Sequence, residues 1–396
     1  MAARGQLPGL IVVTPAAPHV GGAGASGRAA TLIHAAAVDH TVHVVVLDAH
    51  AAESTNQGGL TGVPGAGSLA RVDLMASTTP GGPRSARPAR AVVHDITAQL
   101  GAVDARTVDG VLVLGLALTP VASNLAEWLG VPLLVDAAGD HQGLLRPERP
   151  SVAAEPDWYL GIGCAARAST IITAAEHESE VVERNVDVAG RLVVVPEVAP
   201  IVAWQVGAPV RTGQILVRGD FTQAADLAAA RWLVVEVLPL LPEPLTLDLA
   251  GPAGPEIHHL VARRPGVLVS GEPDLVLDAY HFADVAVAAH RLPGAGRAAV
   301  LEAFSHRRAV VATSAAVDGL AIAPGVHLRL ADAPDTFAAS LMALARPATP
   351  QAEHLVEQQV AAAYELATAT YHPDVVRDLG AEALSAATGV RPRTAA

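Results

Sequence analysis

The chain has 396 residues, which is enough for two domains of ordinary size. Its formal net charge of -13 argues against a nucleic-acid partner, because nucleic-acid phosphates require a basic protein face. All 26 basic residues are arginines, so the sequence also excludes a lysine Schiff base and a lysine phosphate clamp.

Cysteine content and hydropathy favour a cytoplasmic protein. The single cysteine, Cys164, cannot form an intramolecular disulfide and fits a reducing compartment. The first residues, MAARGQLPGLIVV, contain too short an apolar run for a signal peptide. The uncharged segment 110–126 contains Pro120 and Asn124 and falls short of a membrane span. We therefore expect no transmembrane segment, while a peripheral contact with a membrane stays compatible with the sequence.

The N-terminal segment has the pattern of a βαβ unit. Residues 10–14 and 41–47 are β-rich runs, and the alanine-rich stretch 28–38 between them favours a helix. The connecting loop contains Gly22, Gly24 and Gly27, which fit the spacing of a dinucleotide-binding fingerprint. The match is weak, because a proline-bearing loop precedes it and Asp48 is the only acidic residue near the next strand end.

The first half continues with alternating helices and strands. Residues 51–90 are rich in Gly, Pro, Ser and Thr and predict mostly a long, mobile loop. Its arginines could meet an anionic acceptor, although a solvated loop is the favoured interpretation. Beyond it we expect helices at 91–100, 122–129 and 176–184, and strands at 111–116, 132–135, 165–173 and 193–196. This rhythm predicts a parallel sheet, whose ligands bind beyond the carboxyl ends of the strands.

The second half repeats the alternation. Strands are expected at 214–218, 246–250, 266–270 and 284–288, and a long amphipathic helix ends in Trp232, Glu236 and Pro239. Later helices are expected at 335–344, 351–370 and 373–387. The sequence offers no second pair of metal-ligating residues to complement His258 and His259, so we expect no metal site there.

Residues 292–320 combine a glycine-containing loop at 293–296, a helix at 297–307 and a β-branched strand at 309–313. The loop leads into a helix N-terminus, whose unpaired N–H groups suit a phosphate. Glu302 lies one to two turns into the helix, where a carboxylate can accept two hydrogen bonds from the vicinal diol of a ribose.

This stretch resembles the nucleotide-sugar site of the family 4 (group 1) glycosyltransferases. The motif there is a glycine-rich loop, then Leu-Glu-Ala within a helix, then Val-Val-Ala-Thr in a strand. The matching residues are Gly294, Gly296, Arg297, Leu301, Glu302, Ala303, Val310, Val311, Ala312, Thr313, Gly319 and Leu320. The resemblance implies an α/β fold of the GT-B type, in which two Rossmann-like doubly wound domains face a cleft.

The resemblance also implies a domain organisation. An N-terminal, acceptor-side domain would cover residues 1–198 and a linker 199–213. The nucleotide-sugar domain would then cover 214–370, and the helix 371–388 would cross back to the first domain.

Site residues are carried over position by position. The resemblance implies that Arg218 and Arg297 contact the diphosphate beside Gly219, and that Glu302 anchors the ribose. The backbone amides of Gly294, Ala295 and Gly296 would hold the sugar. Gly22 would line the cleft and face the phosphates, and His141 is a candidate catalytic residue beside the donor sugar. His141 reaches the family's histidine position only with a shift of three residues, so an ordinary loop histidine is an equal alternative.

Three departures from the family pattern bear on activity. Gly294 stands where the family has the first of its two glutamates. Ala299 stands where the family has the lysine of its Arg-Leu-Lys sequence. The arginine and lysine that many family members carry after the first strand of the second domain are reduced to Arg218, which is displaced to the position before Gly219. The diphosphate pocket therefore keeps few cations.

Two functions remain in view at this point. The favoured one is a retaining, metal-independent glycosyltransferase that uses a nucleotide-sugar co-substrate, needs no other cofactor, and serves a small-molecule or glycan acceptor. The alternative is a glycosyltransferase-like protein that has lost catalysis and binds a nucleotide, a glycan or a partner subunit. A nicotinamide-dependent oxidoreductase is a distant third, because the weak glycine match is its only support.

Overall fold

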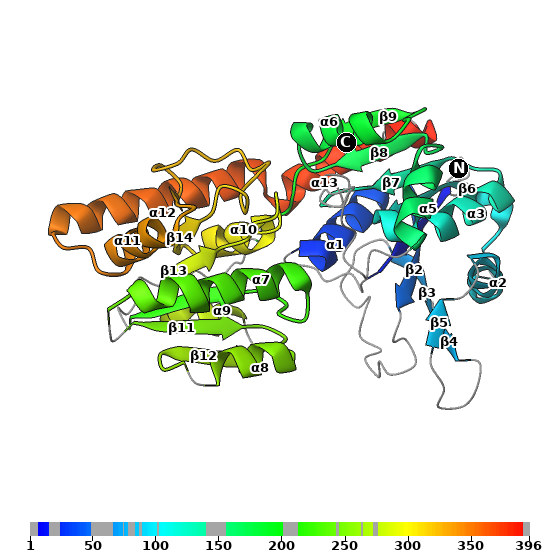
Figure 1. Ribbon diagram of the computed structural model, residues 1–396. Helices are drawn as coiled ribbons and strands as arrows, with labels where there is room; N and C mark the ends of the chain where they lie inside the picture. Colours follow the sequence, from blue (N-terminus) through cyan, green and yellow to red (C-terminus); the bar gives the residue numbers. More distant parts are fainter. Residues whose placement is uncertain are drawn as a thin grey trace. The chain divides into compact units, whose positions relative to one another are not determined.

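The computed structural model describes residues 7–15, 24–48, 66–73, 75–77, 84–86, 89–100, 103–139, 156–200, 213–242, 245–262, 264–271 and 276–390 (Figure 1). The chain divides into two compact units. Unit 1 comprises Met1–Pro196 together with Asp374–Ala396, and unit 2 comprises Glu197–Pro373. The segment 201–212, which holds most of the expected linker, lies outside the described residues.

Unit 1 is built on a seven-stranded sheet with the order β3-β2-β1-β6-β7-β8-β9, and all of its strand pairs are parallel. The central strand β1 is buried at every position, as expected for a parallel strand covered on both faces. The strands are β1 (Gly9–Thr14), β2 (Thr41–Asp48), β3 (Ala66–Asp73), β6 (Val108–Leu114), β7 (Leu133–Asp136), β8 (Thr170–Thr173) and β9 (Arg191–Val194).

Six α-helices are described in unit 1: α1 (Gly24–Ala36), α2 (Ala89–Gln99), α3 (Thr119–Leu129), α5 (Pro156–Ala165), α6 (Glu176–Asn185) and α13 (Pro373–Thr388). Two short 3-10 turns lie at Ala105–Thr107 and Leu116–Leu118. The last helix, α13, packs beside α1 (Figure 1). Ser385 donates to Asp39 over 2.9 Å, and a Cβ at Gly380 would lie 3.1 Å from the Cβ of Ala35. Close packing at this glycine therefore joins the chain's last helix to unit 1.

The expectation of a long loop at 51–90 is wrong for part of that segment. Residues Ala66–Asp73 form the edge strand β3, which pairs with β2 along its whole length. A hairpin follows, made of β4 (Met75–Ser77) and β5 (Arg84–Ala86). The sequence AGSLARVD lacks a clear apolar alternation, so the ladder offered by β2, and not local propensity, accounts for this strand.

Unit 2 has a six-stranded sheet with the order β12-β11-β10-β13-β14-β15. In terms of its own strands this is the 3-2-1-4-5-6 order of a doubly wound nucleotide-binding fold. All neighbouring strands are parallel, as predicted. The strands are β10 (Gln214–Arg218), β11 (Thr246–Ala250), β12 (Val267–Gly271), β13 (Ala283–Ala288), β14 (Ala309–Ala312) and β15 (Arg329–Leu330).

Side chains alternate between two hydrophobic clusters on the two faces of this sheet. Along β13, Val285 and Val287 join one cluster, whereas Ala286 and Ala288 join the other. The period of two follows from strand geometry. The first cluster includes residues of α7, α8 and α11, and the second includes residues of α9, α10 and α12. Helix α10 thus lies on the face that also receives α9.

The helices of unit 2 are α7 (Ala224–Trp232), α8 (Pro255–Val261), α9 (Val276–Phe282), α10 (Arg297–Ser305), α11 (Pro334–Ala345) and α12 (Pro350–Thr370). The long helix expected before Pro239 is divided into α7, a π-helical segment at Leu233–Val237 and a 3-10 turn at Leu238–Leu240. Pro239 cannot continue an α-helix, which explains the tight last turn. None of the described helices combines the length and the apolar character that crossing a membrane requires.

Candidate functional site

The candidate site lies in unit 2, at the carboxyl ends of the neighbouring strands β10 and β13. Strand order reverses between these neighbours, and ligands of doubly wound sheets bind at such a switch point, beyond the carboxyl ends of the strands. Arg218 is the last residue of β10, and Gly219 follows it. The loop after β13 carries His290 and leads through Gly294 into α10. The residues that the resemblance selected therefore meet at the ligand-binding end of the sheet.

A buried cluster joins Arg218, Glu302 and Tyr280. The Nε atom of Arg218 lies 3.3 Å from Oε2 of Glu302, and the Tyr280 hydroxyl donates to the same oxygen over 3.0 Å. Arg218 also donates through Nη1 to the Ala250 carbonyl over 3.0 Å. Glu302 is only 6% exposed, so its carboxylate is held in place by an arginine and a tyrosine.

Tyr280 keeps its proton in this cluster. Burial raises the pKa of its hydroxyl well above the ordinary value, and the negative charge of Glu302 adds to that effect. Behind it, His306 stacks on the Tyr280 ring with centroids 4.3 Å apart. Burial lowers the pKa of His306 to about 4, with further lowering from Arg308 and Arg218. His306 is therefore neutral near pH 7, and its uncharged imidazole packs against the Tyr280 ring.

Arg297 lies over Gly294. A Cβ built on Gly294 would clash with the guanidinium of Arg297, 2.6 Å from both its Cζ and its Nε. Gly294 also has a φ of 72°, a left-handed conformation that favours glycine. Nε of Arg297 donates to the Asp318 carbonyl over 2.6 Å, and the side chain is 3% exposed. The glycine that replaces the family's first glutamate thus makes room for Arg297.

The loop amides are tied to the turn that follows β14. The N–H of Gly294 donates to the Ala315 carbonyl over 2.7 Å, and that of Gly296 donates to Ala316 over 3.1 Å. The N–H of Ala295 donates to Leu292 over 3.2 Å. These bonds fix the shape of the loop. The first N–H groups inside α10, at Ala298 and Ala299, are the ones that helix geometry leaves without intrahelical acceptors.

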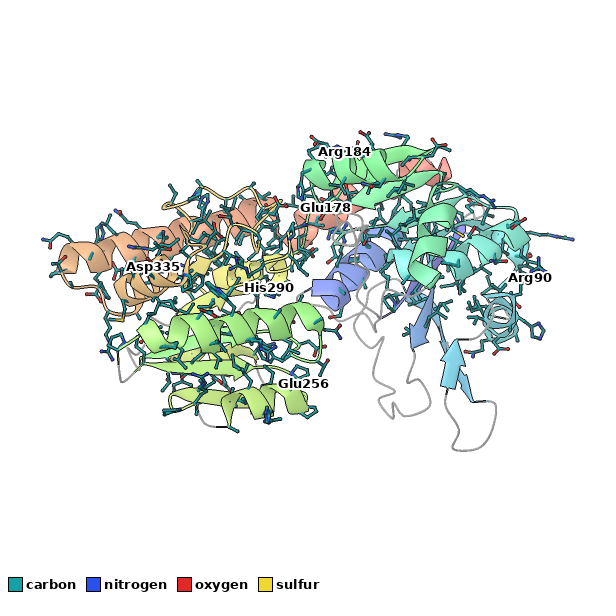
Figure 2. All side chains as sticks on the ribbon, in the orientation of Figure 1. Arg90, Glu178, Arg184, Glu256, His290 and Asp335 are labelled. Atoms are coloured by element: carbon teal, nitrogen blue, oxygen red, sulfur yellow. The ribbon has the colours of Figure 1, made fainter. Side chains whose placement is uncertain are left out.

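A second polar group, which the sequence patterns did not identify, links Gly219 to the loop after β13. Nε2 of His290, a residue labelled in Figure 2, lies 2.6 Å from Oδ1 of Asp226. The other carboxylate oxygen of Asp226 accepts from the Asp220 amide over 2.7 Å. A carboxylate beside Nε2 favours the tautomer that carries the proton there, which leaves Nδ1 as an acceptor. Nδ1 is buried without a hydrogen-bond partner, and it would lie 3.0 Å from a Cβ at Gly296.

Gly219 packs closely against the Asp226 side chain that contacts His290. A Cβ there would lie 3.0 Å from Cγ of Asp226, so a larger residue would displace the carboxylate from His290. The signal for His290 was present in the sequence, since it follows directly on a strand run that ends at the sheet edge expected to bind ligands. Asp226 lies 64 positions earlier in α7 and carried no comparable signal.

Two of the expected site residues, Gly22 and His141, lie outside the described residues. His258 and His259 lie in α8, on the surface. Within the described part of the chain, no group of three or more histidine, cysteine, aspartate or glutamate side chains is arranged to hold a metal ion.

Comparison with solved structures identifies the class of fold. HepE of Anabaena, in complex with UDP-glucose, matches with a TM-score of 0.69 and 14% identity, covering 96% of this chain and 100% of that one. Sucrose-phosphate synthase of Thermosynechococcus elongatus matches with 0.65 and 14%, covering 93% and 96%. A glycosyltransferase of Rickettsia africae matches with 0.60 and 12%, covering 97% and 99%. The expected GT-B fold is thereby confirmed.

The match to a protein-family model covers less of the chain than the matches to solved structures, and it lies in unit 2, which contains the candidate site. Residues 212–346 match a family model described as Glycosyl transferases group 1. This match falls in the family that the motif at 292–320 predicted, and it includes the whole of that motif. A search of curated protein sequences finds no match to this chain.

Proposed function

We propose that this chain is a retaining, metal-independent glycosyltransferase that moves a sugar from a nucleotide-diphosphate donor to a small-molecule or glycan acceptor. The observation that carries the proposal is the contact between Arg218 and Glu302 at the switch point of the unit 2 sheet. These residues lie 84 positions apart, yet they meet where a doubly wound fold binds nucleotides.

Each group has a distinct role in the proposed complex. Glu302 accepts from the ribose hydroxyls, and Arg218 beside it faces the diphosphate, so a single ion pair joins the two halves of the nucleotide. Arg297 supplies the second cation from the first turn of α10. The bonds of Gly294 and Gly296 to residues 315 and 316 give the loop its shape, and the amides of Ala298 and Ala299 meet the phosphate at the helix start.

Metal independence follows from how the leaving group is stabilised in this proposal. Departure of a nucleoside diphosphate builds negative charge on the phosphate oxygens, and arginines with a helix N-terminus can meet that charge. The roles of His141 and Gly22 stay predictions from the resemblance, because both residues lie outside the described part of the chain. The enzyme works in the cytoplasm, in keeping with its lone cysteine, and reaches membrane-bound acceptors by peripheral contact.

A second candidate function is nucleotide or glycan binding without catalysis. The burial of Arg297 and its bond to the Asp318 carbonyl favour this alternative, because a side chain held that way has to move to meet a phosphate. The missing carboxylate at Gly294 favours it as well. A non-catalytic protein that binds a nucleotide would use the same residues of unit 2 as the enzyme and would differ from it in turnover.

Calorimetric titration of the full chain with UDP, GDP and NAD tests the shared part of the proposal. Saturable binding of a nucleoside diphosphate and none of NAD is expected. Tight NAD binding without diphosphate binding would reject both candidates. For the nucleotide that binds, its sugar conjugate is then incubated with protein and followed by proton NMR. Sugar release or transfer with the donor's anomeric configuration, in the presence of EDTA, is the expected result, and no turnover with any donor tried supports the binding protein.

A further inference from the structure

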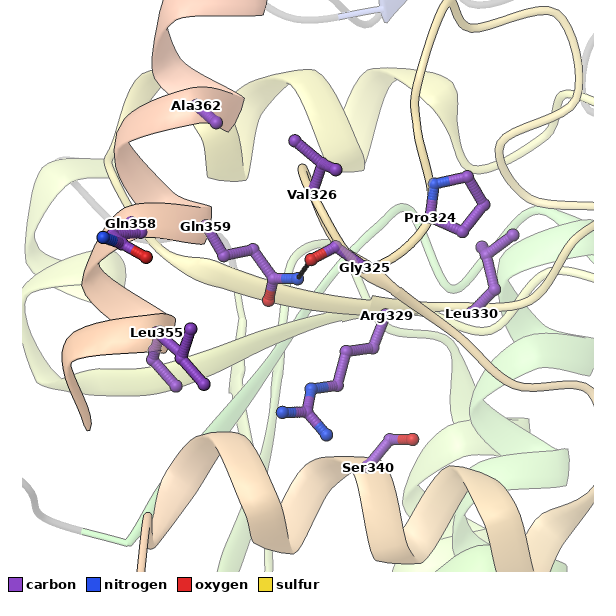
Figure 3. A pocket seen from close by; sticks show the side chains of 11 residues that line it. Pro324, Gly325, Val326, Arg329, Leu330, Ser340, Leu355, Gln358, Gln359 and Ala362 are labelled. Carbon is purple, nitrogen blue, oxygen red and sulfur yellow. Dashed lines mark hydrogen bonds between the residues drawn. The ribbon is translucent and has the colours of Figure 1, made fainter. Parts of the chain in front are cut away.

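Unit 2 contains a pocket that shares no residue with the candidate site. It lies between the edge strand β15, the loop before it, and helices α11 and α12, and it has a volume of about 780 Å³ (Figure 3). Pockets of this volume accommodate small metabolites. Its walls combine apolar side chains such as Leu355 and Val326 with a few polar groups.

Arg329 gives this pocket a positive charge. Its side chain extends across the pocket toward α11, the helix that carries Ser340 (Figure 3). The lining contains no carboxylate, and no ion pair of Arg329 occurs within the described part of the chain. A half-buried arginine without a carboxylate partner in the pocket lining attracts an anion, even in a chain of net charge -13.

Gln359 adds a buried acceptor that lacks a donor. Its Nε2 donates to the Gly325 carbonyl over 3.1 Å, which fixes the amide orientation because a carbonyl can only accept. The residue is 7% exposed, and its Oε1 has no hydrogen-bond partner. Figure 3 shows this oxygen turned away from Gly325, to the side on which the Arg329 guanidinium lies. A buried acceptor left unpaired is costly, and a ligand hydroxyl would satisfy it.

We propose that this pocket binds a phosphorylated polyol of the hexose-phosphate class. The phosphate meets the Arg329 fork and the Ser340 hydroxyl, because a phosphate offers a third oxygen after two have paired with the guanidinium. A ring hydroxyl donates to Oε1 of Gln359, and the apolar face of the sugar packs on Leu355. The pocket is a second ligand site, and its assignment does not depend on the function of the candidate site.

Titration calorimetry of the full chain with glucose 6-phosphate, inorganic phosphate, glucose and glucuronate tests this proposal. Glucose 6-phosphate is expected to bind most tightly, inorganic phosphate more weakly, and glucose weakest of all. Arg329→Gln is expected to reduce the affinity for glucose 6-phosphate about tenfold or more, and Arg329→Lys less. Gln359→Leu is expected to weaken glucose 6-phosphate but to leave inorganic phosphate unchanged. Arg231→Gln, which removes an exposed arginine on α7, is the matched control and is expected to change nothing.

Circular dichroism melting of each variant separates a lost contact from a lost fold. The proposal fails if glucose 6-phosphate shows no saturable binding to folded wild-type protein up to about 1 mM. It also fails if a folded Arg329→Gln protein binds as tightly as wild type, or if Arg231→Gln weakens binding equally. Glucuronate binding as tight as glucose 6-phosphate would contradict the assignment of a phosphate.

Discussion

Each unit contains a buried arginine–carboxylate pair at the ligand-binding end of its sheet, and the two pairs differ in their contacts. In unit 1, Arg28 binds Asp136 through two parallel bonds of 2.8 Å. The remaining nitrogen, Nη1, donates to the Val195 and Pro196 carbonyls over 3.1 and 2.8 Å. In unit 2, Nε of Arg218 donates to Oε2 of Glu302 over 3.3 Å, and Nη1 donates to the Ala250 carbonyl over 3.0 Å.

The difference separates a structural clamp from a site that can accept a ligand. Every nitrogen of the Arg28 guanidinium donates within unit 1, and the pair joins α1, β7 and the segment after β9. The contact between Arg218 and Glu302 is longer, so we expect less bonding to be lost there when the guanidinium turns toward a phosphate. We therefore expect the two arginine–carboxylate pairs to have different roles.

The largest expected effect is on the unit 1 pair. Arg28→Met leaves Asp136 buried without its cation and is expected to reduce the free energy of unfolding by about 3–5 kcal/mol. Arg218→Met is expected to cost less, about 1–3 kcal/mol, because Tyr280 still donates to Glu302. Urea denaturation measures the loss in free energy of unfolding for each variant, and hydrogen exchange by peptide shows which unit is destabilised. Equal losses for the two variants would contradict the comparison.

The next prediction concerns the glycine that accommodates Arg297. Gly294→Ala imposes a left-handed residue and also displaces the guanidinium, so a loss of about 3 kcal/mol or more is expected. Gly271→Ala is the matched control in the same unit, with a φ of 68° and nothing within 4 Å of the added Cβ. It is expected to lose only about 1–2 kcal/mol. Thermal or urea unfolding measures the loss of stability for both variants. An equal loss for Gly271→Ala and Gly294→Ala would show that the contact with Arg297 contributes nothing.

The pH dependence of unit 2 stability reports on the support behind Tyr280. His306 has a folded pKa of about 4, below the ordinary histidine value of 6.5. As pH falls through 6.5 the unfolded chain takes up the proton first, so stability is lost progressively until about pH 4. The loss reaches about 2 kcal/mol near pH 5.

His306→Phe keeps a ring against Tyr280 and removes the titration. The pKa values of His40, His43 and His327 are also lowered by burial, so wild type and variant both lose stability in acid. The measured quantity is the difference between their urea midpoints at neutral and mildly acidic pH. Identical acid losses would show that His306 does not titrate in this window.

A smaller effect is expected for Arg297 in ligand binding. If its guanidinium meets the diphosphate, Arg297→Ala weakens a nucleoside diphosphate about tenfold and the matching nucleoside much less. Calorimetry with UDP and uridine, or with GDP and guanosine, measures this ratio. An equal loss for both ligands would mean that the substitution only disturbed the loop that Arg297 covers.

Much of unit 2 could be predicted from the sequence, because local pattern and tertiary structure agree there. The strands expected at 214–218 and 246–250 are β10 and β11 with the same ends, and Glu302 lies inside the expected helix. Such runs are buried on both faces and have no competing conformation of comparable burial.

The partners of these residues could not be predicted, since they depend on contacts between distant segments. Tyr280 meets Glu302 from α9, a helix for which no capping or periodic signal was recognised. Asp226 meets His290 across 64 positions, and Arg297 fills the space of a side chain that Gly294 lacks. A rule that pairs polar residues following neighbouring parallel strands would have grouped His290 with Arg218.

The central claim is that the unit 2 pair serves a nucleotide whereas the unit 1 pair serves the fold. The most direct test measures the dissociation constant of the preferred nucleoside diphosphate for wild type and for Glu302→Gln, which keeps the side-chain shape and removes the charge. The account predicts about a tenfold or greater loss of affinity in a protein whose hydrogen exchange shows both units folded. An unchanged dissociation constant would contradict it and would make the Arg218–Glu302 contact a second structural clamp.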